Sequence, residues 1–220
     1  MNSRINSSKD SGRRNLAHKL DWAIKEVKKL QAEKQNLLKE LYNDSLTGIA
    51  NRRAFDEKLP ELVQIAHSSK EPLALMLADV DGLKRVNDKL GHQLGDALLA
   101  AVGNSLNQAA RGTDLAGRLG GDEYYAILPG FAATNEQSED QLMRSTTARY
   151  AKAFDSAVEK LQLPGRLKVG VSFGIAILAP SESAESLYKR ADDIARSNKR
   201  ALYYRLNQVG PVSEAEHLSA

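Results

Sequence analysis

Two adjacent glycines divide the stretch Gly117-Arg118-Leu119-Gly120-Gly121-Asp122-Glu123-Tyr124-Tyr125-Ala126-Ile127-Leu128-Pro129 of this 220-residue chain. A short alternating run precedes them and a nearly continuous apolar run follows. This pattern predicts a β-hairpin, because the favoured tight turns need positive φ at both central residues. Asp122 and Glu123 stand where the chain enters the second strand, and carboxylates on a rigid turn suit a divalent cation. A polar tip that only solubilises a loop is the alternative for the hairpin alone.

The composition is that of a globular protein with one full-sized domain and an appendage. Hydrophobic residues make up 42% and charged residues 27% of the chain. The absence of cysteine excludes a disulfide framework, a thiolate metal site and a cysteine nucleophile. No run approaches the roughly 20 apolar residues of a membrane span, and the N-terminus lacks the apolar core of a signal peptide. We therefore expect a soluble, cytoplasmic protein with no membrane span.

The charge is unevenly distributed along the chain. Residues 1–40 hold 10 Lys and Arg against 5 Asp and Glu, so this segment carries +5 and the remainder −2 of the net charge of +3. A basic arm can contact nucleic acid. No aromatic residues alternate with the basic ones to stack on bases, so we favour a solvated helix face and expect no nucleic-acid partner. Residues 1–13 are polar and are expected to be disordered.

A heptad pattern occupies residues 14–43. Its two apolar rows alternate in steps of four and three, which predicts a dimerising coiled-coil helix. Lys34 interrupts one row, which weakens the pairing and helps to set its register. A single amphipathic helix packed on its own domain is the alternative. The rows are Leu16, Ala23, Leu30 and Leu37, and Leu20, Val27, Lys34 and Leu41.

The remaining segments predict one domain over residues 44–207, followed by a frayed tail over residues 208–220. Helical and strand periods follow one another in the order helix, strand, helix, two hairpin strands, helix, strand, helix. This order predicts an α/β (α+β) fold with a split βαβ sheet that contains antiparallel strands and is flanked by helices. The helices are expected at 51–67, 95–109, 142–163 and from 183, and the strands at 73–80, on both sides of the glycine pair, and at 167–178.

A second acidic cluster, Asp79-Val80-Asp81-Gly82, ends the strand at 73–80. Asp79 and Asp122 are predicted to lie on neighbouring strands, where converging acids can hold the paired Mg²⁺ ions of phosphoryl transfer. Asn87 and Asp96 have an alternative as helix caps, and His92 as a structural histidine. The groups that a nucleotide needs are Lys84, Lys199 and Arg200 for phosphates and Asn87, His92 and Asp96 for a base edge.

Together these motifs resemble those of the GGDEF family, the diguanylate cyclases, over residues 44–204. The hairpin segment 120–124 is similar to the family signature. Residues 79–88, with Gly91-His92 and Gly95-Asp96, resemble its metal and guanine motif. Residues 44–53 resemble its entry motif, and residues 171–176 its last core strand. The implied fold is the sheet of nucleotide cyclases, which is similar to the polymerase palm.

The resemblance implies that the chain condenses two GTP into cyclic di-GMP and two pyrophosphates, with two Mg²⁺ or Mn²⁺ ions in each active site. Asp96 would accept from guanine N1–H and the exocyclic amine, which favours GTP over ATP. The implied metal site comprises Asp79, Val80 through its carbonyl, Asp122 and Glu123. The implied catalytic residues are Asp122, Glu123 and Lys84. The implied substrate-binding residues are Leu83, Lys84, Asn87, His92, Asp96, Gly120, Gly121 and Lys199.

In the implied mechanism, the metal lowers the pKa of a ribose 3′-hydroxyl, which attacks the α-phosphorus of a second GTP. Asp122 or Glu123 takes the proton, and Lys84 stabilises the developing charge. One domain binds one GTP, so two domains must face each other. The resemblance therefore implies a homodimer that the N-terminal helix brings together.

A further similarity is regulatory, because Arg111-Gly112-Thr113-Asp114 resembles the family's product-inhibition motif Arg-x-x-Asp. The planar guanidinium of arginine suits guanine or phosphate. The resemblance implies that cyclic di-GMP binds Arg111 and Asp114 as an inhibitor, with Arg144 or Arg149 completing the site. An exposed salt bridge is the alternative.

Three positions depart from the family pattern. Tyr124 and Leu83 each replace a usual Phe, and Tyr203 stands where Arg is common, so one phosphate contact is missing or is supplied by Arg200 or Arg205. A catalytically weak domain that binds GTP or cyclic di-GMP as a receptor is therefore the alternative function. A mixed-nucleotide cyclase is a third interpretation, which Asp96 disfavours.

Overall fold

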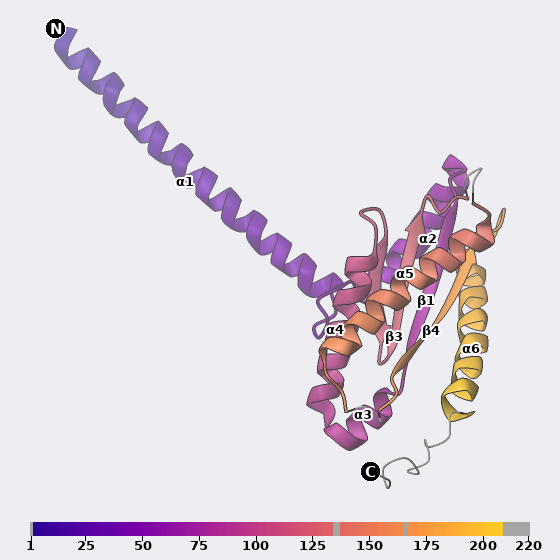
Figure 1. The fold of residues 1–220 in the computed structure, drawn as a ribbon. Coiled ribbons are helices and arrows are strands. Elements are labelled where there is room, and N and C mark those ends of the chain that lie inside the picture. Colours follow the sequence, from indigo (N-terminus) through magenta and orange to yellow (C-terminus); the bar gives the residue numbers. More distant parts are fainter. Residues whose placement is uncertain (1, 134–136, 165–166, 209–220) are drawn as a thin grey trace. The chain divides into compact units, whose positions relative to one another are not determined.

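The computed structural model describes the backbone of residues 2–133, 137–164 and 167–208, and the side chains of residues 18–133, 137–164 and 167–201. The chain divides into two compact units, residues 1–41 and residues 42–220. Figure 1 labels the helices and, except for β2, the strands, which are numbered in chain order.

The first unit is helix α1 (Asn2–Tyr42). The seam side chains Leu20, Val27, Leu30 and Leu37 are all more than half exposed. Leu16 lies outside the described side chains. The helix also includes residues 2–13, which we expected to be disordered. Those residues contain no proline and only one glycine, and helix growth is cooperative once a nucleus exists. Within the described residues, no helix combines the length and apolarity that crossing a membrane requires.

The second unit is built on a four-stranded antiparallel sheet with the strand order β2-β3-β1-β4. Strand β1 lies between β3 and β4, and nearly all of its side chains are buried because helices cover both faces of the sheet. The predicted split βαβ arrangement is confirmed. The strands are β1 (Leu73–Asp81), β2 (Leu115–Gly120), β3 (Glu123–Pro129) and β4 (Gly170–Ile177).

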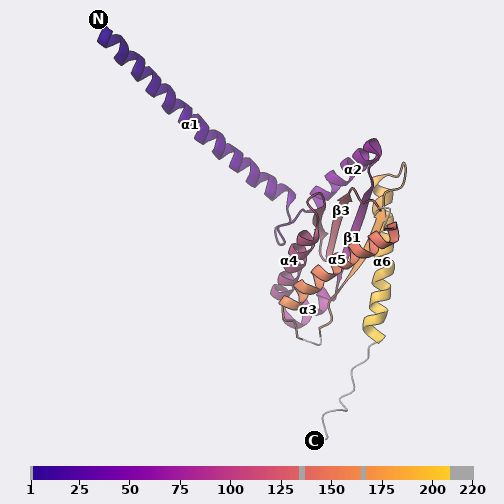
Figure 2. The ribbon, with the colours of Figure 1, turned by 45° about the horizontal axis from the view of Figure 1, so that its top comes forward.

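Helices α2 (Arg52–Ser69) and α6 (Ala184–Gln208) cover one face of this sheet. Helices α4 (His92–Ala109) and α5 (Glu139–Lys160) cover the other face, as Figures 1 and 2 show. The sequence analysis missed one helix, α3 (Leu83–Leu90), which directly follows β1. Its apolar residues Leu83, Val86 and Leu90 recur at helical spacing, but the segment has only eight residues, which is shorter than the window over which such spacing predicts a helix.

Three elements of the second unit have boundaries three residues from the predicted ones, among them helix α5, which covers Glu139–Lys160 rather than residues 142–163. Helix α4 begins at His92 rather than at Gly95, because its first turn is polar. Strand β4 begins at Gly170 rather than at Leu167. Helix α6 ends at Gln208, so the predicted frayed tail lies outside the described residues apart from its first residue.

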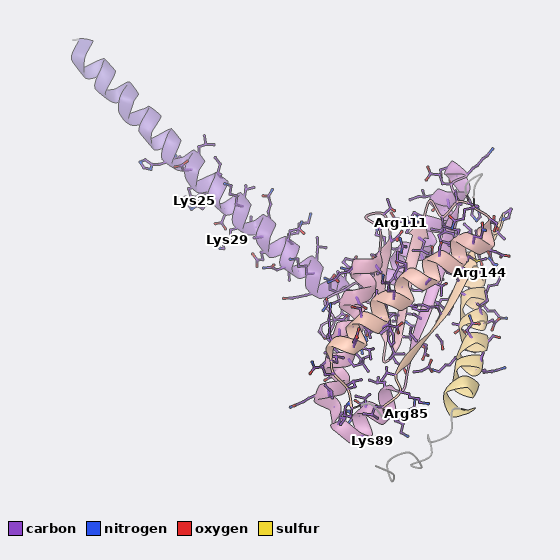
Figure 3. All side chains as sticks on the ribbon, in the orientation of Figure 1. Lys25, Lys29, Arg85, Lys89, Arg111 and Arg144 are labelled. Carbon is purple, nitrogen blue, oxygen red and sulfur yellow. The ribbon has the colours of Figure 1, made fainter. Side chains whose placement is uncertain are left out.

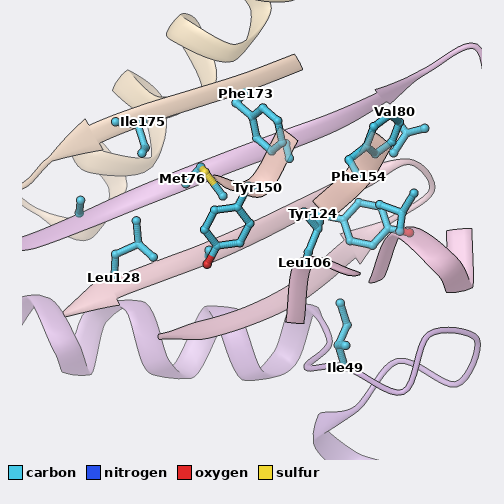
Figure 4. Close-up of a cluster of buried hydrophobic side chains, with 14 of the residues drawn as sticks. Ile49, Met76, Val80, Leu106, Tyr124, Leu128, Tyr150, Phe154, Phe173 and Ile175 are labelled. Atoms are coloured by element: carbon cyan, nitrogen blue, oxygen red, sulfur yellow. The ribbon is translucent and has the colours of Figure 1, made fainter. Parts of the chain in front are cut away.

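The core has two layers, one on each face of the sheet. Alternate β1 residues divide between them: Met76 and Val80 pack toward α4 and α5, whereas Leu75 and Leu77 pack toward α2 and α6. Figure 4 shows the first layer, including Tyr124 and Phe154. The Tyr124 hydroxyl donates to the carbonyl of Leu99 at 2.7 Å. The Tyr124 departure from the family pattern is therefore accommodated, because the buried hydroxyl has a partner.

Candidate active site

The hairpin turn carries the first two acidic residues of the site. Gly120 and Gly121 both have positive φ, at 138° and 55°, as the sequence pattern required. Glu123 is the cross-strand partner of Asp79, and the backbone N–H of Val80 donates to the carbonyl of Asp122 at 3.0 Å. The structure thus places the end of β1 beside the hairpin tip.

A lysine from α6 completes an ionic cluster at the end of β1. Lys199 Nζ lies 2.5 Å from Asp79 Oδ1 and 3.8 Å from Asp81 Oδ1. The Ser172 hydroxyl on β4 donates to Asp81 Oδ2 at 2.7 Å. Asp79 and Asp81 are two residues apart on one strand, so both side chains point to the α6 face of the sheet.

The charges in this cluster oppose one another. Burial raises the pKa of Asp79, and the neighbouring carboxylates of Asp122 and Asp81 raise it further against the opposing effect of Lys199. Burial lowers the pKa of Lys199, but the carboxylates of Asp79, Asp81 and Asp122 outweigh burial and raise it overall. Asp122 therefore contributes to the same electrostatic site as Asp79.

A cavity of about 190 Å³ lies between this cluster and α6. Leu77, Leu119 and the ring of Tyr188 give it an apolar wall. Its charged wall consists of Asp79, Glu123, Asp192, Arg196 and Lys199. A cavity with an apolar floor and a few convergent charges is typical of a small-ligand site.

Divalent metal ions are compatible with these side chains. Among the described residues, no three Asp, Glu, His or Cys side chains are grouped as a complete metal site. Mg²⁺ does not need such a group, because it is commonly held by one or two carboxylates together with substrate phosphates and water. The Asp79 and Asp122 carboxylates repel each other, and a hard cation between them would relieve that repulsion.

The residues predicted to read the base lie on either side of the junction of α3 and α4. A Cβ at Gly95 would stand 1.8 Å from Asn87 Oδ1, so the Asn87 amide lies directly against α4 at the residue that precedes Asp96 in sequence. Gly91 is the cap residue of both helices, and Asp96 lies inside α4. The alternative roles of Asn87 and Asp96 as helix caps are therefore wrong.

Other predicted site residues are less closely associated. Leu83 packs against the core, and Lys84 and His92 are exposed. No ion pair involves Lys84 among the described residues. The backbone of Tyr203 lies in α6, but its side chain is outside the described part of the chain, as are the side chains beyond residue 201.

The Arg-x-x-Asp motif forms a compact turn before β2. The Arg111 N–H donates to Asp114 Oδ2 at 2.7 Å, and the Asp114 side chain is only 3% exposed. Arg149 Nη2 on α5 lies 3.7 Å from the same oxygen. Arg144, labelled in Figure 3, also lies on α5, but it forms no ion pair with the motif among the described residues. Of the two candidate arginines, the structure brings Arg149 to the motif.

Comparison with known proteins agrees with this geometry. The family model described as "Diguanylate cyclase, GGDEF domain" matches residues 41–203. The chain belongs to the GGDEF family.

Two curated GGDEF relatives are diguanylate cyclases. The chain is 30% identical over 186 residues to diguanylate cyclase DgcP of Pseudomonas aeruginosa, covering 84% of this chain and 26% of the relative. It is 32% identical over 171 residues to diguanylate cyclase DgcM of Escherichia coli, covering 77% of this chain and 38% of the relative. The chain thus spans less than half the length of these two relatives.

Solved GGDEF structures extend the likeness to the N-terminal helix. The coiled coil and GGDEF domain of DgcB from Caulobacter crescentus, in complex with c-di-GMP, matches with a TM-score of 0.66 and 29% identity. That match covers 84% of this chain and 95% of the DgcB chain. Diguanylate cyclase SiaD of Pseudomonas aeruginosa, in complex with its activator SiaC, matches with a TM-score of 0.61 and 26% identity, covering 90% and 79% of the two chains.

Two residues of the site were not among those predicted from the sequence. Asp81 contacts Lys199, and its spacing of two from Asp79 on a strand was the available signal. Arg118, on β2, donates to the carbonyl of Gly121 in the hairpin turn. No sequence signal distinguished Arg118, because a buried arginine in a strand cannot be recognised without its partners.

Proposed function

We propose that this chain is a diguanylate cyclase that condenses two GTP into cyclic di-GMP and two pyrophosphates. The observation that carries the proposal is the meeting of the Asp79 strand end, the Asp122 turn and Lys199 beside one cavity. The family membership and the curated cyclase relatives support it. Burial raises the pKa of Asp79, and the carboxylates of Asp122 and Asp81 add to that effect, as is common for acids gathered at a functional site.

The roles of the individual residues follow from their positions. Asp79 and Asp122, assisted by the Val80 carbonyl and Glu123, would hold Mg²⁺ or Mn²⁺, with two ions per site as the expected number. The bound metal supplies charge neutralisation of the triphosphate and acidification of the attacking 3′-hydroxyl. Lys199 binds the phosphates, for which it exchanges its contacts with the acids.

Guanine selection belongs to the α3–α4 junction. Asn87 and Asp96 read the edge of the base, and Leu83 and His92 support it. The Asp96 carboxylate accepts hydrogen bonds from guanine N1–H and from the exocyclic amine. Adenine does not present this pair of donors, so the carboxylate would lack its hydrogen-bond partners with ATP. Lys84, the first charged residue of α3, reaches the triphosphate from the exposed side. Gly120 and Gly121 allow the turn to approach the substrate without a side chain.

The active species is proposed to be a homodimer. One domain holds one GTP, so bond formation at an α-phosphorus requires a second domain that faces the first. The exposed apolar seam of α1 supplies the contact between two copies, because such a row is stable in water only when it is covered.

Product inhibition is proposed at the turn of Arg111 and Asp114. Among the described residues the Arg111 guanidinium makes no ion pair, so its planar donors are available to an anionic nucleotide. Arg149 completes the site. Its guanidinium stacks over the Tyr150 ring at 5.2 Å and approaches Asp114, while its Nε has no hydrogen-bond partner within the described structure.

The test is incubation of the purified chain with GTP and Mg²⁺, followed by chromatographic separation of the nucleotides, with ATP as the control substrate. Cyclic di-GMP from GTP and no cyclic product from ATP are expected. If GTP stays unconsumed while the chain still binds cyclic di-GMP, the receptor alternative replaces the cyclase. Formation of a mixed or adenine cyclic product would contradict the role of Asp96.

A further inference from the structure

Arg118 is a charged residue whose side chain is buried within the β-hairpin. It lies on β2 and its side chain is only 10% exposed. Its Nε and Nη2 atoms both donate to the carbonyl of Gly121, at 3.0 and 2.7 Å. Its Nη1 atom donates to both carboxylate oxygens of Asp44, at 3.0 and 3.2 Å. One guanidinium therefore joins the hairpin turn to the loop after α1.

We call the contacts of Arg118 with Gly121 and with Asp44 the Arg118 brace. The Asp44 side chain in this brace is also held by a neighbouring residue. Asp44 Oδ1 accepts from the Thr47 N–H at 2.9 Å and from the Thr47 hydroxyl at 2.7 Å. Burial opposes ionisation of Asp44, but the hydrogen bonds from Thr47 and Arg118 outweigh it and hold the pKa of this carboxyl below its ordinary value. The brace therefore joins two ionised groups with their hydrogen bonds satisfied, the condition for a buried ion pair to hold one geometry.

The atom that Arg118 holds controls the direction of Asp122. The Gly121 carbonyl belongs to the peptide group that precedes Asp122, and the Asp122 carbonyl belongs to the one that follows. Arg118 fixes the first peptide plane, and the N–H of Val80 fixes the second at 3.0 Å. Gly121 has a φ of 55° and no side chain to restrict it, so its peptide could rotate without the brace.

We propose that Arg118 is a positioning residue, held by Asp44, that fixes the Gly121 peptide and thereby aims the Asp122 carboxylate at the reacting centre. This inference rests on the proposed cyclase activity for its kinetic consequence, but its effect on metal binding is independent of turnover. Lysine cannot replace this arginine, because a single ammonium group does not reproduce a planar fork that spans two partners.

The test compares the wild-type chain with Arg118→Lys and Asp44→Asn. In Arg118→Lys, kcat should fall by about 10²-fold, the order that a small misplacement of a catalytic group costs. The Mn²⁺ concentration for half-saturation, measured by electron paramagnetic resonance with a non-hydrolysable GTP analogue, should rise about tenfold. At saturating Mn²⁺ the KM for GTP should stay within about twofold, because the α3–α4 junction is untouched. Asp44→Asn should show smaller changes in the same two quantities.

A matched control is available in Arg190. This arginine also bridges a backbone carbonyl and a carboxylate, those of Ile177 and Glu182, but at the N-terminal end of α6. Arg190→Lys should lower the melting temperature without changing kcat or Mn²⁺ half-saturation. The melting temperature of each variant is measured first, and all assays are run below the lowest of them.

Each outcome distinguishes this inference from the proposed function. A wild-type chain that makes no cyclic di-GMP would refute the cyclase, while the Mn²⁺ titration would still test the brace. Wild-type kcat and Mn²⁺ half-saturation in Arg118→Lys would overturn the positioning role. Loss of the cooperative melting transition in both Arg118→Lys and Asp44→Asn would also overturn it, because the ion pair would then be a folding element.

Discussion

The sharpest prediction concerns a residue that would not touch the substrate. In Gly95→Ala, the new methyl group would stand 1.8 Å from Asn87 Oδ1, so the Asn87 amide must rotate away from its place against α4. The three atoms nearest to that methyl all belong to the same amide. The substitution therefore removes one guanine contact while leaving the Asn87 residue and the fold in place.

The magnitudes follow from the two effects that compete. A hydrogen bond to the base contributes about 1 kcal/mol, so its loss should raise the KM for GTP about fivefold. Replacing glycine by alanine inside a helix stabilises the fold by about 0.5–1 kcal/mol. Gly95→Ala should consequently bind GTP less well and melt at the wild-type temperature or slightly above.

The assay is steady-state kinetics and thermal melting of Gly95→Ala, Asn87→Ala and the double variant. If the methyl acts through Asn87, the two single variants should show similar increases in KM, and the double variant should show no further increase. An unchanged KM in Gly95→Ala, or additive effects in the double variant, would refute the assignment of Asn87 to the base edge.

Three further predictions concern the acids, the inhibitory turn and the sheet. Asp79→Asn should abolish turnover yet raise the melting temperature at pH 7. The pKa of Asp79 is raised in the folded state, so its ionisation destabilises the fold. The destabilisation by ionised Asp79 is absent below the ordinary pKa of aspartate and complete above the folded-state pKa. Thermal melting at pH 7 and pH 4 should therefore show a smaller difference in melting temperature between Asp79→Asn and the wild type at pH 4. Arg149→Met should raise the concentration of cyclic di-GMP for half-inhibition about tenfold at unchanged kcat, since one charge-assisted contact contributes about 1.5 kcal/mol; equal inhibition of both proteins would contradict its place in the site. Gly174→Ala should lower the free energy of unfolding by about 3 kcal/mol in denaturant titration, because its methyl would stand 2.2 Å from the α6 carbonyl of Ala191; wild-type stability would contradict this packing.

Much of the fold could be predicted from the sequence, because the patterns that specify its helices and strands are local in the chain. The glycine pair specified the hairpin through its positive φ angles, and the apolar run from Leu73 specified a strand buried on both faces. Helix α3 was missed because its apolar spacing covers only eight residues between two glycines, too few for a periodic pattern to predict a helix. The register of β1 against β3, which places Asp79 opposite Glu123, depends on neighbours about forty residues apart in sequence.

The candidate site was only partly accessible, for a related reason. Asp79 and Asp122 could be paired from the strand pattern alone. The contact of Lys199 with Asp81, and the brace of Arg118 on Gly121, join residues that no local period connects. Arg149 could not be separated from Arg144 by spacing, because which of them reaches Asp114 depends on the rotation of α5 against the turn.

The central claim is that the acids at the end of β1 and the hairpin turn form the reaction centre of a cyclase. Its most direct test is the rate of cyclic di-GMP formation by the wild-type chain and by Asp122→Asn, with saturating GTP and Mg²⁺ and with GTP binding measured in parallel. We predict product from the wild type, and no detectable product from Asp122→Asn despite retained GTP binding. Equal rates from the two proteins, or product from neither, would contradict this account of the site.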